Sequence, residues 1–108
     1  MTVKELSEKC GFKPAALPDG NREIDGCYIG DLLSWVMGRA EGDCVWITIM
    51  SNLNIIAVAT LADVACIVLS EGVTVEDSII KLAEEKGVNI LLSDKKTYET
   101  AIDVYKTI

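Results

Sequence analysis

The longest stretch with almost no charge limits the fold of this chain more than any other feature. Residues 44–70 carry a single charged side chain, Asp63. A helix that spans a bilayer needs about 20 consecutive apolar residues, and Ser51, Asn52 and Asn54 interrupt the stretch before that length is reached. The pattern therefore predicts a buried strand, a helix and a second buried strand, with no membrane insertion.

The sequence after this stretch continues the same alternation and predicts a β-α-β-α-β-α unit. Uninterrupted apolar strands that alternate with helices are typical of a mainly parallel sheet flanked by helices. Asn52 or Asn54, Thr74 and Ser93 are the expected N-caps of the three helices. The predicted strands are residues 44–50, 64–69 and 88–92, and the predicted helices are residues 55–61, 75–86 and a last helix that follows Ser93.

An N-terminal helix precedes this unit. Thr2 and Glu5 have the spacing of a capping box, and Gly11 is the expected end of the helix. Pro14 and the turn residues 18–20 then break the chain.

Another strand and another helix lead into the apolar stretch. Residues 22–29 alternate imperfectly and predict a strand, within which Gly26 suggests a bulge or a close backbone approach. Asp31 is the expected N-cap of a helix that runs to about Arg39. Since no repeat or linker interrupts the sequence, we expect residues 1–108 to form one α/β domain.

Charge and composition exclude several classes of function. The chain has 10 Lys and Arg against 17 Asp and Glu, a formal net charge of −7, and no histidine. Nucleic-acid binding is not expected, because it usually requires a basic face. The missing histidine removes the commonest general base and metal ligand. We accordingly expect no catalytic residue, no metal site and no cofactor.

The cysteines point to a reducing compartment. Cys10, Cys27, Cys44 and Cys66 form no Cys-x-x-Cys pair, and the first residues lack the apolar core of a signal peptide. We expect a cytoplasmic protein in which the thiols are small buried hydrophobes rather than disulfides.

The best candidate binding residues follow predicted strands. In a parallel sheet, ligands bind beyond the carboxyl ends of the strands, where this sequence places Ser51, Asn52, Asn54 and Ser70. A small anion or the polar edge of a nucleotide fits such a set. The alternative is that these side chains only cap helices.

A second candidate is the glycine-flanked turn that contains Gly26, Gly30 and Asp31. Glycines there allow close approach of a ligand or a second subunit, or they only serve turn geometry. The spacings Gly-x-x-x-x-Gly-Lys and Gly-x-Gly-x-x-Gly are absent, so phosphoryl transfer has no support.

The sequence also suggests an interface between subunits. The helix predicted after residue 54 is apolar nearly all round, so it must be covered on more than one side, and a second subunit is a plausible cover. Ile55 and Ile56 on this helix, together with Trp35, are the candidate interface residues. Asp63 is expected to cap a helix or to form an ion pair.

Three stretches resemble a known family. Residues 20–26, 28–38 and 46–54 are similar to the small stand-alone DRTGG-domain proteins of anaerobic bacteria. The literal Asp-Arg-Thr-Gly-Gly signature is absent, and Asn21-Arg22 and Gly26 stand where its residues fall.

The resemblance implies an α/β fold similar to the N-terminal domain of HPr kinase/phosphorylase. Such domains also occur fused to phosphotransacetylases, and between CBS domains of regulated pyrophosphatases, where they help to form a homodimer. The stand-alone forms are encoded near hydrogenase and redox genes, which implies a regulatory role and a protein partner in anaerobic energy metabolism. Relatives are labelled serine kinases, but this chain has no phosphate loop.

Three hypotheses follow, in decreasing order of support. The first is a non-enzymatic regulatory module that forms a homodimer. The second is a sensor of a nucleotide-like anion bound near Ser51, Asn52, Asn54 and Ser70. The third is a metal-dependent enzyme that uses Asp31 or Asp63.

Overall fold

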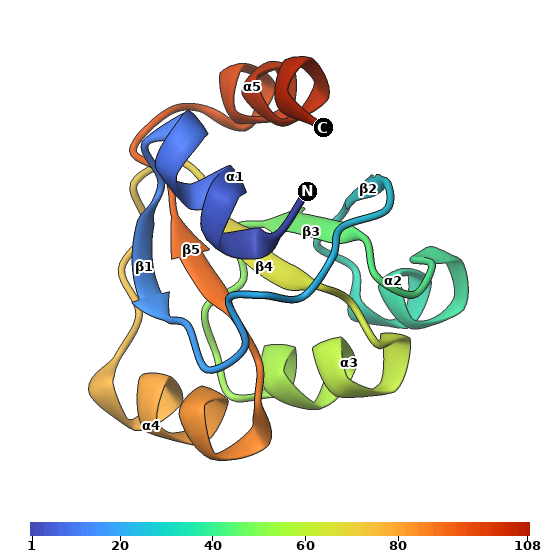
Figure 1. The fold of residues 1–108 in the computed structure, drawn as a ribbon. Helices are drawn as coiled ribbons and strands as arrows, with labels where there is room; N and C mark the ends of the chain where they lie inside the picture. The colour runs from blue at the N-terminus through green and yellow to red at the C-terminus, as the bar shows by residue number, and fades with distance from the viewer.

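A computed structural model describes all residues, 1–108, as one sheet with helices on both of its faces (Figure 1). The sheet contains five strands, and ten elements alternate along the chain. In chain order they are α1 (Val3–Cys10), β1 (Lys13–Ala16), β2 (Cys27–Ile29), α2 (Leu33–Arg39), β3 (Val45–Thr48), α3 (Asn54–Ala62), β4 (Cys66–Leu69), α4 (Asp77–Lys86), β5 (Ile90–Leu92) and α5 (Thr97–Thr107).

The sheet is mainly parallel, as predicted. Its strand order is β1-β5-β4-β3-β2, and only the pairing of β1 with β5 is antiparallel. Both central strands, β3 and β4, are buried along their whole length. The predicted β-α-β-α-β-α order from residue 44 is confirmed.

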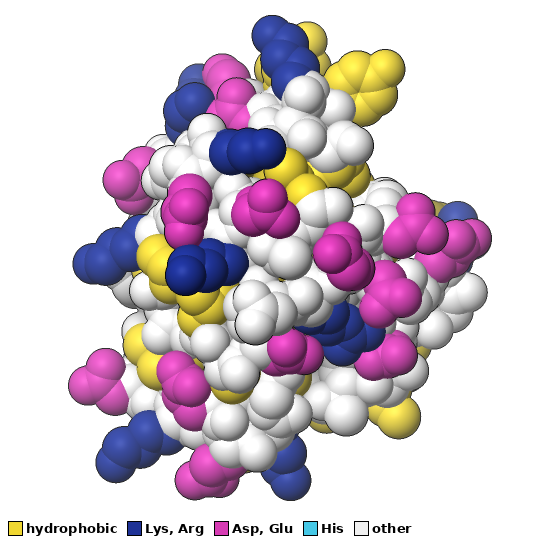
Figure 2. All heavy atoms as spheres, in the orientation of Figure 1, with side chains coloured by type: hydrophobic (Ala, Val, Ile, Leu, Met, Phe, Trp, Pro, Cys, Tyr) yellow, Lys and Arg dark blue, Asp and Glu magenta, His cyan; other side chains and the backbone are white.

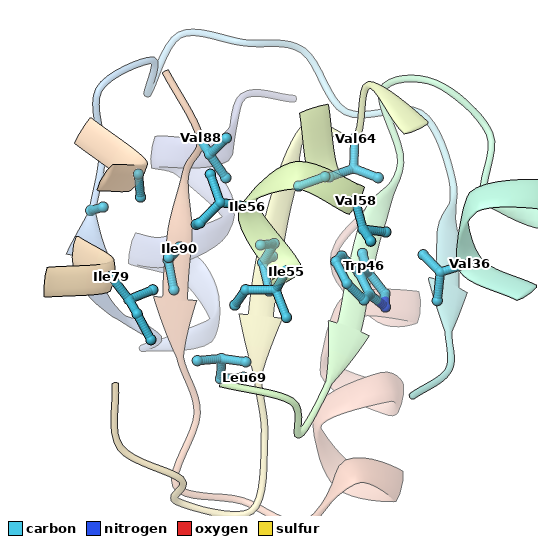
Figure 3. Close-up of a cluster of buried hydrophobic side chains, with 14 of the residues drawn as sticks. Val36, Trp46, Ile55, Ile56, Val58, Val64, Leu69, Ile79, Val88 and Ile90 are labelled. Carbon is cyan, nitrogen blue, oxygen red and sulfur yellow. The ribbon is translucent and has the colours of Figure 1, made fainter. Parts of the chain in front are cut away.

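The helices form two layers, with α2, α3 and α4 on one face of the sheet and α1 and α5 on the other (Figure 1). On the first face, Ile55 and Ile56 of α3 lie over the sheet between Trp46 of β3 and Ile90 of β5 (Figure 3). The second face is filled by residues of α1, α5 and the alternate positions of the strands, which include Val3, Leu6, Phe12, Val45, Ile47, Cys66, Val68, Leu91 and Val104. Because strand side chains alternate between faces, one strand supplies both cores.

The N-terminal part differs from the prediction. Pro14 does not end regular structure but lies within β1, which is tolerated because an edge strand leaves one side without ladder hydrogen bonds. The predicted strand over residues 22–29 is a strand only at Cys27–Ile29. Most of residues 17–26, here called the amino-end segment, instead runs past the amino ends of the strands (Figure 1).

Helix caps are predicted well at one end of the chain and poorly elsewhere. Thr2 Oγ1 accepts a hydrogen bond from Glu5 N at 3.2 Å, Glu5 Oε1 accepts one from Thr2 N at 3.0 Å, and Gly11 ends α1 with a φ of 70°. The three other helices with a predicted cap begin later than expected. The residues at their N-caps are Leu32, Glu76 and Lys96, not Asp31, Thr74 and Ser93.

Asn52 and Asn54 also do not cap α3. The helix begins at Asn54 and has Leu53 at its N-cap without a side-chain hydrogen bond. Asn52 Oδ1 accepts from Asn54 N at 2.9 Å and so closes a turn before the helix. None of the five helices combines the length and the apolar composition that crossing a membrane requires.

Candidate functional site

Three of the four predicted binding residues lie together. Ser51, Asn52 and Asn54 line an open hollow of about 670 Å³ between the end of β3 and the starts of α3 and α4, here called the α3 hollow. Glu76 and Ser78 form its opposite side. The prediction therefore located a concave surface at the carboxyl end of the sheet, where ligands of parallel sheets bind.

Ser70 is not part of the α3 hollow. Its side chain is fully buried, and its Oγ lies 2.7 Å from Thr97 Oγ1. The next residue, Glu71, accepts a hydrogen bond from Thr97 N at 2.6 Å. The loop before α5 thus closes the carboxyl end of β4, and the prediction that Ser70 joins Ser51, Asn52 and Asn54 in one site is corrected.

The chemistry of the α3 hollow is that of a polar binding surface. At the start of α3 the N–H groups of Asn54 and Ile55 already donate to Asn52. The start of α4 has no side-chain cap, so the N–H groups of Asp77 and Ser78 remain available as donors. The Asn52 and Ser51 side chains add amide and hydroxyl groups, whereas the Glu76 carboxylate opposes an anion. The hollow contains no nucleophile paired with a base.

The glycine-flanked turn has a structural explanation. Gly26 adopts a φ of 83°, and a Cβ at this position would contact nothing within 4 Å, so its conformation and not a close neighbour requires glycine. A Cβ on Gly30 would lie 3.0 Å from the ring of Tyr28. The Gly30 carbonyl accepts a hydrogen bond from Trp46 Nε1 at 2.9 Å.

Asp31 joins the ends of two strands. Its Oδ1 accepts hydrogen bonds from Thr48 Oγ1 at 2.8 Å and from Ile49 N at 3.1 Å. These contacts use the carboxylate that the sequence assigned to helix capping. No group of three or more Cys, Asp and Glu side chains lies close enough to hold a metal ion.

Arg22 forms the densest charged cluster of the molecule, at the opposite end of the sheet. Its Nη2 lies 2.9 Å from Asp43 Oδ1 and 2.9 Å from Asp63 Oδ1, and it also donates to the Asp63 carbonyl at 2.7 Å. Partial burial opposes the charge, but the hydrogen bonds that Arg22 donates to Asp43 and Asp63 outweigh it and raise the pKa of Arg22. The expectation that Asp63 caps a helix or forms an ion pair is confirmed, since it does both.

The two aspartates of this cluster hold unusual backbone conformations. Asp43 has a φ of 65° and Asp63 a φ of 56°, a region that costs energy for residues other than glycine. The Arg22 contacts help to offset that cost. Figure 2 shows acidic side chains gathered over the side of the molecule where β2 and α2 lie. Arg22 thus links the loops that carry Asp43 and Asp63.

Three thiols lie at the amino ends of neighbouring parallel strands. Cys27 begins β2, Cys44 precedes β3 and Cys66 begins β4. Burial raises the pKa of Cys27 to about 11 and also raises the pKa of Cys44 and Cys66. Cys44 and Cys66 are buried as predicted, and Cys10 is half-buried. Cys27 is exposed as a whole residue, although neighbouring atoms desolvate its thiol, and no cysteine is in a disulfide.

A second hollow, also of about 670 Å³, was not predicted. It lies between β1, the loop of residues 72–75 and the end of β5, and is here called the β1 hollow. Its position depends on β1, which the sequence reading missed because of Pro14. The short apolar run after Gly11 was the one available signal.

An apolar surface covers α2 and α3 on the side that faces away from the sheet. Ile55 and Ile56 do not contribute to it, because they are 0% and 2% exposed in the core of the chain itself. Their assignment to an interface is therefore corrected. Trp35 does contribute, with the Arg39 guanidinium 3.8 Å above its ring. The α2–α3 surface consists of the exposed side chains of Leu32, Trp35, Met37, Leu53 and Leu61.

The fold is similar to a solved regulatory structure. The crystal structure of the CBS and DRTGG domains of the regulatory region of Clostridium perfringens pyrophosphatase, complexed with its activator diadenosine tetraphosphate, superposes with a TM-score of 0.76. The similarity covers 99% of this chain at 10% sequence identity. This chain spans about half of that one, 47% of its length.

Sequence comparison identifies the family. No curated protein sequence matches the chain. The profile of the DRTGG domain matches residues 27–107, which is most of the chain and includes every element from β2 to α5. The resemblance found in the sequence is thus confirmed, and the chain belongs to the DRTGG domain family.

Proposed function

We propose that this chain is a regulatory module that acts as a homodimer and has no catalytic activity of its own. The observation that carries the proposal is the α2–α3 surface, where five large apolar side chains on or just before two contacting helices are exposed. Membership of the DRTGG family and the similarity to a pyrophosphatase regulatory region support a regulatory role.

The charge distribution favours a second copy of the same chain as the occupant of this surface. Two molecules that each carry a formal charge of −7 repel each other wherever their acidic faces meet. Residues 44–62, which include all of α3, contain no charged side chain. The α2–α3 surface is therefore the region where two copies meet with the least electrostatic cost.

The shape of α3 suits a symmetric contact. Leu53, Ala57 and Leu61 recur every four residues and are all exposed, so they form one apolar stripe along the outer side of the helix. The small Ala57 at the centre allows two helices to approach closely. In a two-fold dimer each stripe packs against its own copy, since such an interface is self-complementary.

Light scattering on a size-exclusion column tests the dimer. We expect the unmodified chain to be a dimer at micromolar concentration and Leu61→Glu to be a monomer with an unchanged circular dichroism spectrum. Tyr105→Glu is the matched control, because Tyr105 is also strongly exposed but lies on α5, on the other face of the sheet. A monomeric unmodified chain, or a Leu61→Glu dimer, contradicts the proposal.

The regulated partner is a separate question. The resemblance to stand-alone DRTGG proteins favours a partner protein of redox metabolism, and we propose that the dimer binds such a protein. Affinity purification with the dimer and with Leu61→Glu as bait would show whether the partner requires the dimer.

A second candidate function is a sensor of a nucleotide-like anion at the α3 hollow. It is favoured by the uncapped start of α4 at the hollow and by the activator bound to the similar pyrophosphatase region. Calorimetric titration with diadenosine tetraphosphate and with ATP tests it. Asn52→Ala is expected to abolish binding, and Asn21→Ala, an exposed amide outside the hollow, is expected to preserve it. Equal affinity in both variants removes this candidate.

A further inference from the structure

The β1 hollow has the features of a binding site and lies apart from the α2–α3 surface. It is formed by the end of α1, by β1, by the loop of residues 72–75 and by the end of β5. Its volume of about 670 Å³ falls within the range of small-molecule sites, roughly 300–1,000 Å³. It also lies at the carboxyl end of β5, the end at which parallel sheets bind ligands.

The floor of the hollow is apolar and already formed. Side chains from four different segments line it and pack against the main core while remaining partly accessible. A ligand with an apolar group can therefore remove this surface from water without moving the backbone. The floor residues are Ala15, Val73, Val75, Ile80 and Leu92.

The rim carries one free charge of each sign. Lys13 stands opposite Leu92 in the antiparallel ladder, so its side chain is on the same face of the sheet as the floor. Neither the Lys13 ammonium nor the Asp94 carboxylate is in an ion pair, whereas the adjacent Lys95 is held by Asp103 at 2.7 Å.

Backbone donors are also available at the rim. The N–H groups of Thr74 and Asp94 make no hydrogen bond to another backbone group and none to a side chain of the chain. Both residues line the hollow. These two N–H groups and the Lys13 ammonium are donors of the kind that a carboxylate accepts from, and all three residues line the same hollow.

We propose that the β1 hollow binds a small zwitterion with an apolar side chain, that is, an apolar α-amino acid. Its carboxylate is bound by Lys13 and the backbone N–H groups, its ammonium by Asp94, and its side chain by the apolar floor. A polyphosphate fits less well, because the carboxylate of Asp94 cancels the charge of Lys13. This site is independent of the proposed dimer, and each fails or stands without the other.

Three related compounds test the charge requirement. Phenylalanine has both charges, 3-phenylpropanoate lacks the ammonium and phenylalaninamide lacks the carboxylate. In amide NMR spectra of the full chain, we expect phenylalanine to shift signals of residues 72–75 and 92–95 and the two analogues to bind roughly tenfold more weakly, the effect of losing one charged hydrogen-bond partner. No shift at any concentration up to about 10 mM, which corresponds to negligible affinity, overturns the proposal.

Two variants then assign the roles of the rim residues. Lys13→Met is expected to weaken the binding of phenylalanine and of 3-phenylpropanoate alike. Asp94→Asn is expected to weaken the binding of phenylalanine and to strengthen that of 3-phenylpropanoate, because it removes a negative charge beside the anion. Lys81→Met is the matched control, since Lys81 is exposed on α4 outside the hollow. Equal binding of phenylalanine by Lys13→Met, Asp94→Asn and Lys81→Met contradicts the assignment.

Discussion

The two ends of the sheet are built in opposite ways. At the amino end, the amino-end segment (residues 17–26) is bound to the starts of three strands through Arg22 and Asn89. At the carboxyl end, two hollows remain open between loops. The contrast teaches that side-chain hydrogen bonds tie the amino end of the sheet together, while the two hollows of about 670 Å³ lie at its carboxyl end.

Removing the side chain of Asn89 should destabilise the amino end of the sheet more than any other change considered. This buried amide accepts from Asp19 N at 3.0 Å and donates to the carbonyls of Asp19 and Ala65 at 2.8 and 2.9 Å. Asn89→Ala leaves the Asp19 N–H and the Ala65 carbonyl without partners, while the Asp19 carbonyl keeps its hydrogen bond from Arg22 N. The change should lower the free energy of unfolding by about 3 kcal/mol. Urea denaturation measures the change, with the exposed Asn21→Ala as control; a loss equal to that of the control contradicts this role.

Arg22→Met should have the next largest effect. The change leaves Asp43 and Asp63 in left-handed conformations without their shared partner, and we expect a loss of about 2 kcal/mol, less than for a fully buried pair because both aspartates are exposed. Thermal unfolding of Arg22→Met and of Arg39→Met, whose guanidinium contacts only Trp35, gives the comparison. Equal unfolding temperatures for Arg22→Met and Arg39→Met would contradict the prediction.

Alkaline pH should also weaken the amino end. Burial raises the pKa of Cys27 to about 11, and of Cys44 and Cys66, so the unfolded chain releases these protons at a lower pH than the folded chain does. Stability is therefore retained below the ordinary thiol pKa of 9.0 and falls as the pH rises above it. The urea concentration at the midpoint of unfolding should fall as the pH is raised from neutral to near the pKa of Cys27. The fall should be shallower for Cys66→Ala than for the unmodified chain. Parallel declines would show that other groups are responsible.

The carboxyl end should tolerate change. Asn52→Ala removes one hydrogen bond to the exposed Asn54 N–H and is expected to alter the free energy of unfolding by less than about 0.5 kcal/mol. The same urea titration measures it. A loss comparable to that of Arg22→Met would mean that the α3 hollow serves the fold and is not free to bind.

This difference between the ends also explains which features the sequence could predict. The alternation from residue 44 was readable because apolar strands and the spacing of apolar residues along helices are local patterns, although the expected caps of these helices were wrong. The capping box of Thr2 and Glu5 was readable for the same reason. The strand β1 was missed because its pairing partner, β5, lies far away in the sequence, and nothing local outweighs Pro14.

The candidate sites show the same division. The hollow at residues 51–54 followed from a general rule about parallel sheets, and the structure places it there. Ser70 and Asp31 were misjudged because long-range contacts to Thr97 and Thr48 occupy their side chains. The β1 hollow was invisible in the sequence, since its walls come from distant segments.

The pairing of the two chain ends has a consequence for biosynthesis. β1 is held only by β5, α1 packs against α5, and the Cys10 thiol donates to Thr107 Oγ1 at 3.4 Å. While the ribosome is still translating the second half, the apolar side of α1 lacks β5 and α5, which are part of the core that covers it. Emerging chains are thus open to chaperones until Thr107 has left the exit tunnel, and the native state forms after synthesis of this segment rather than during it.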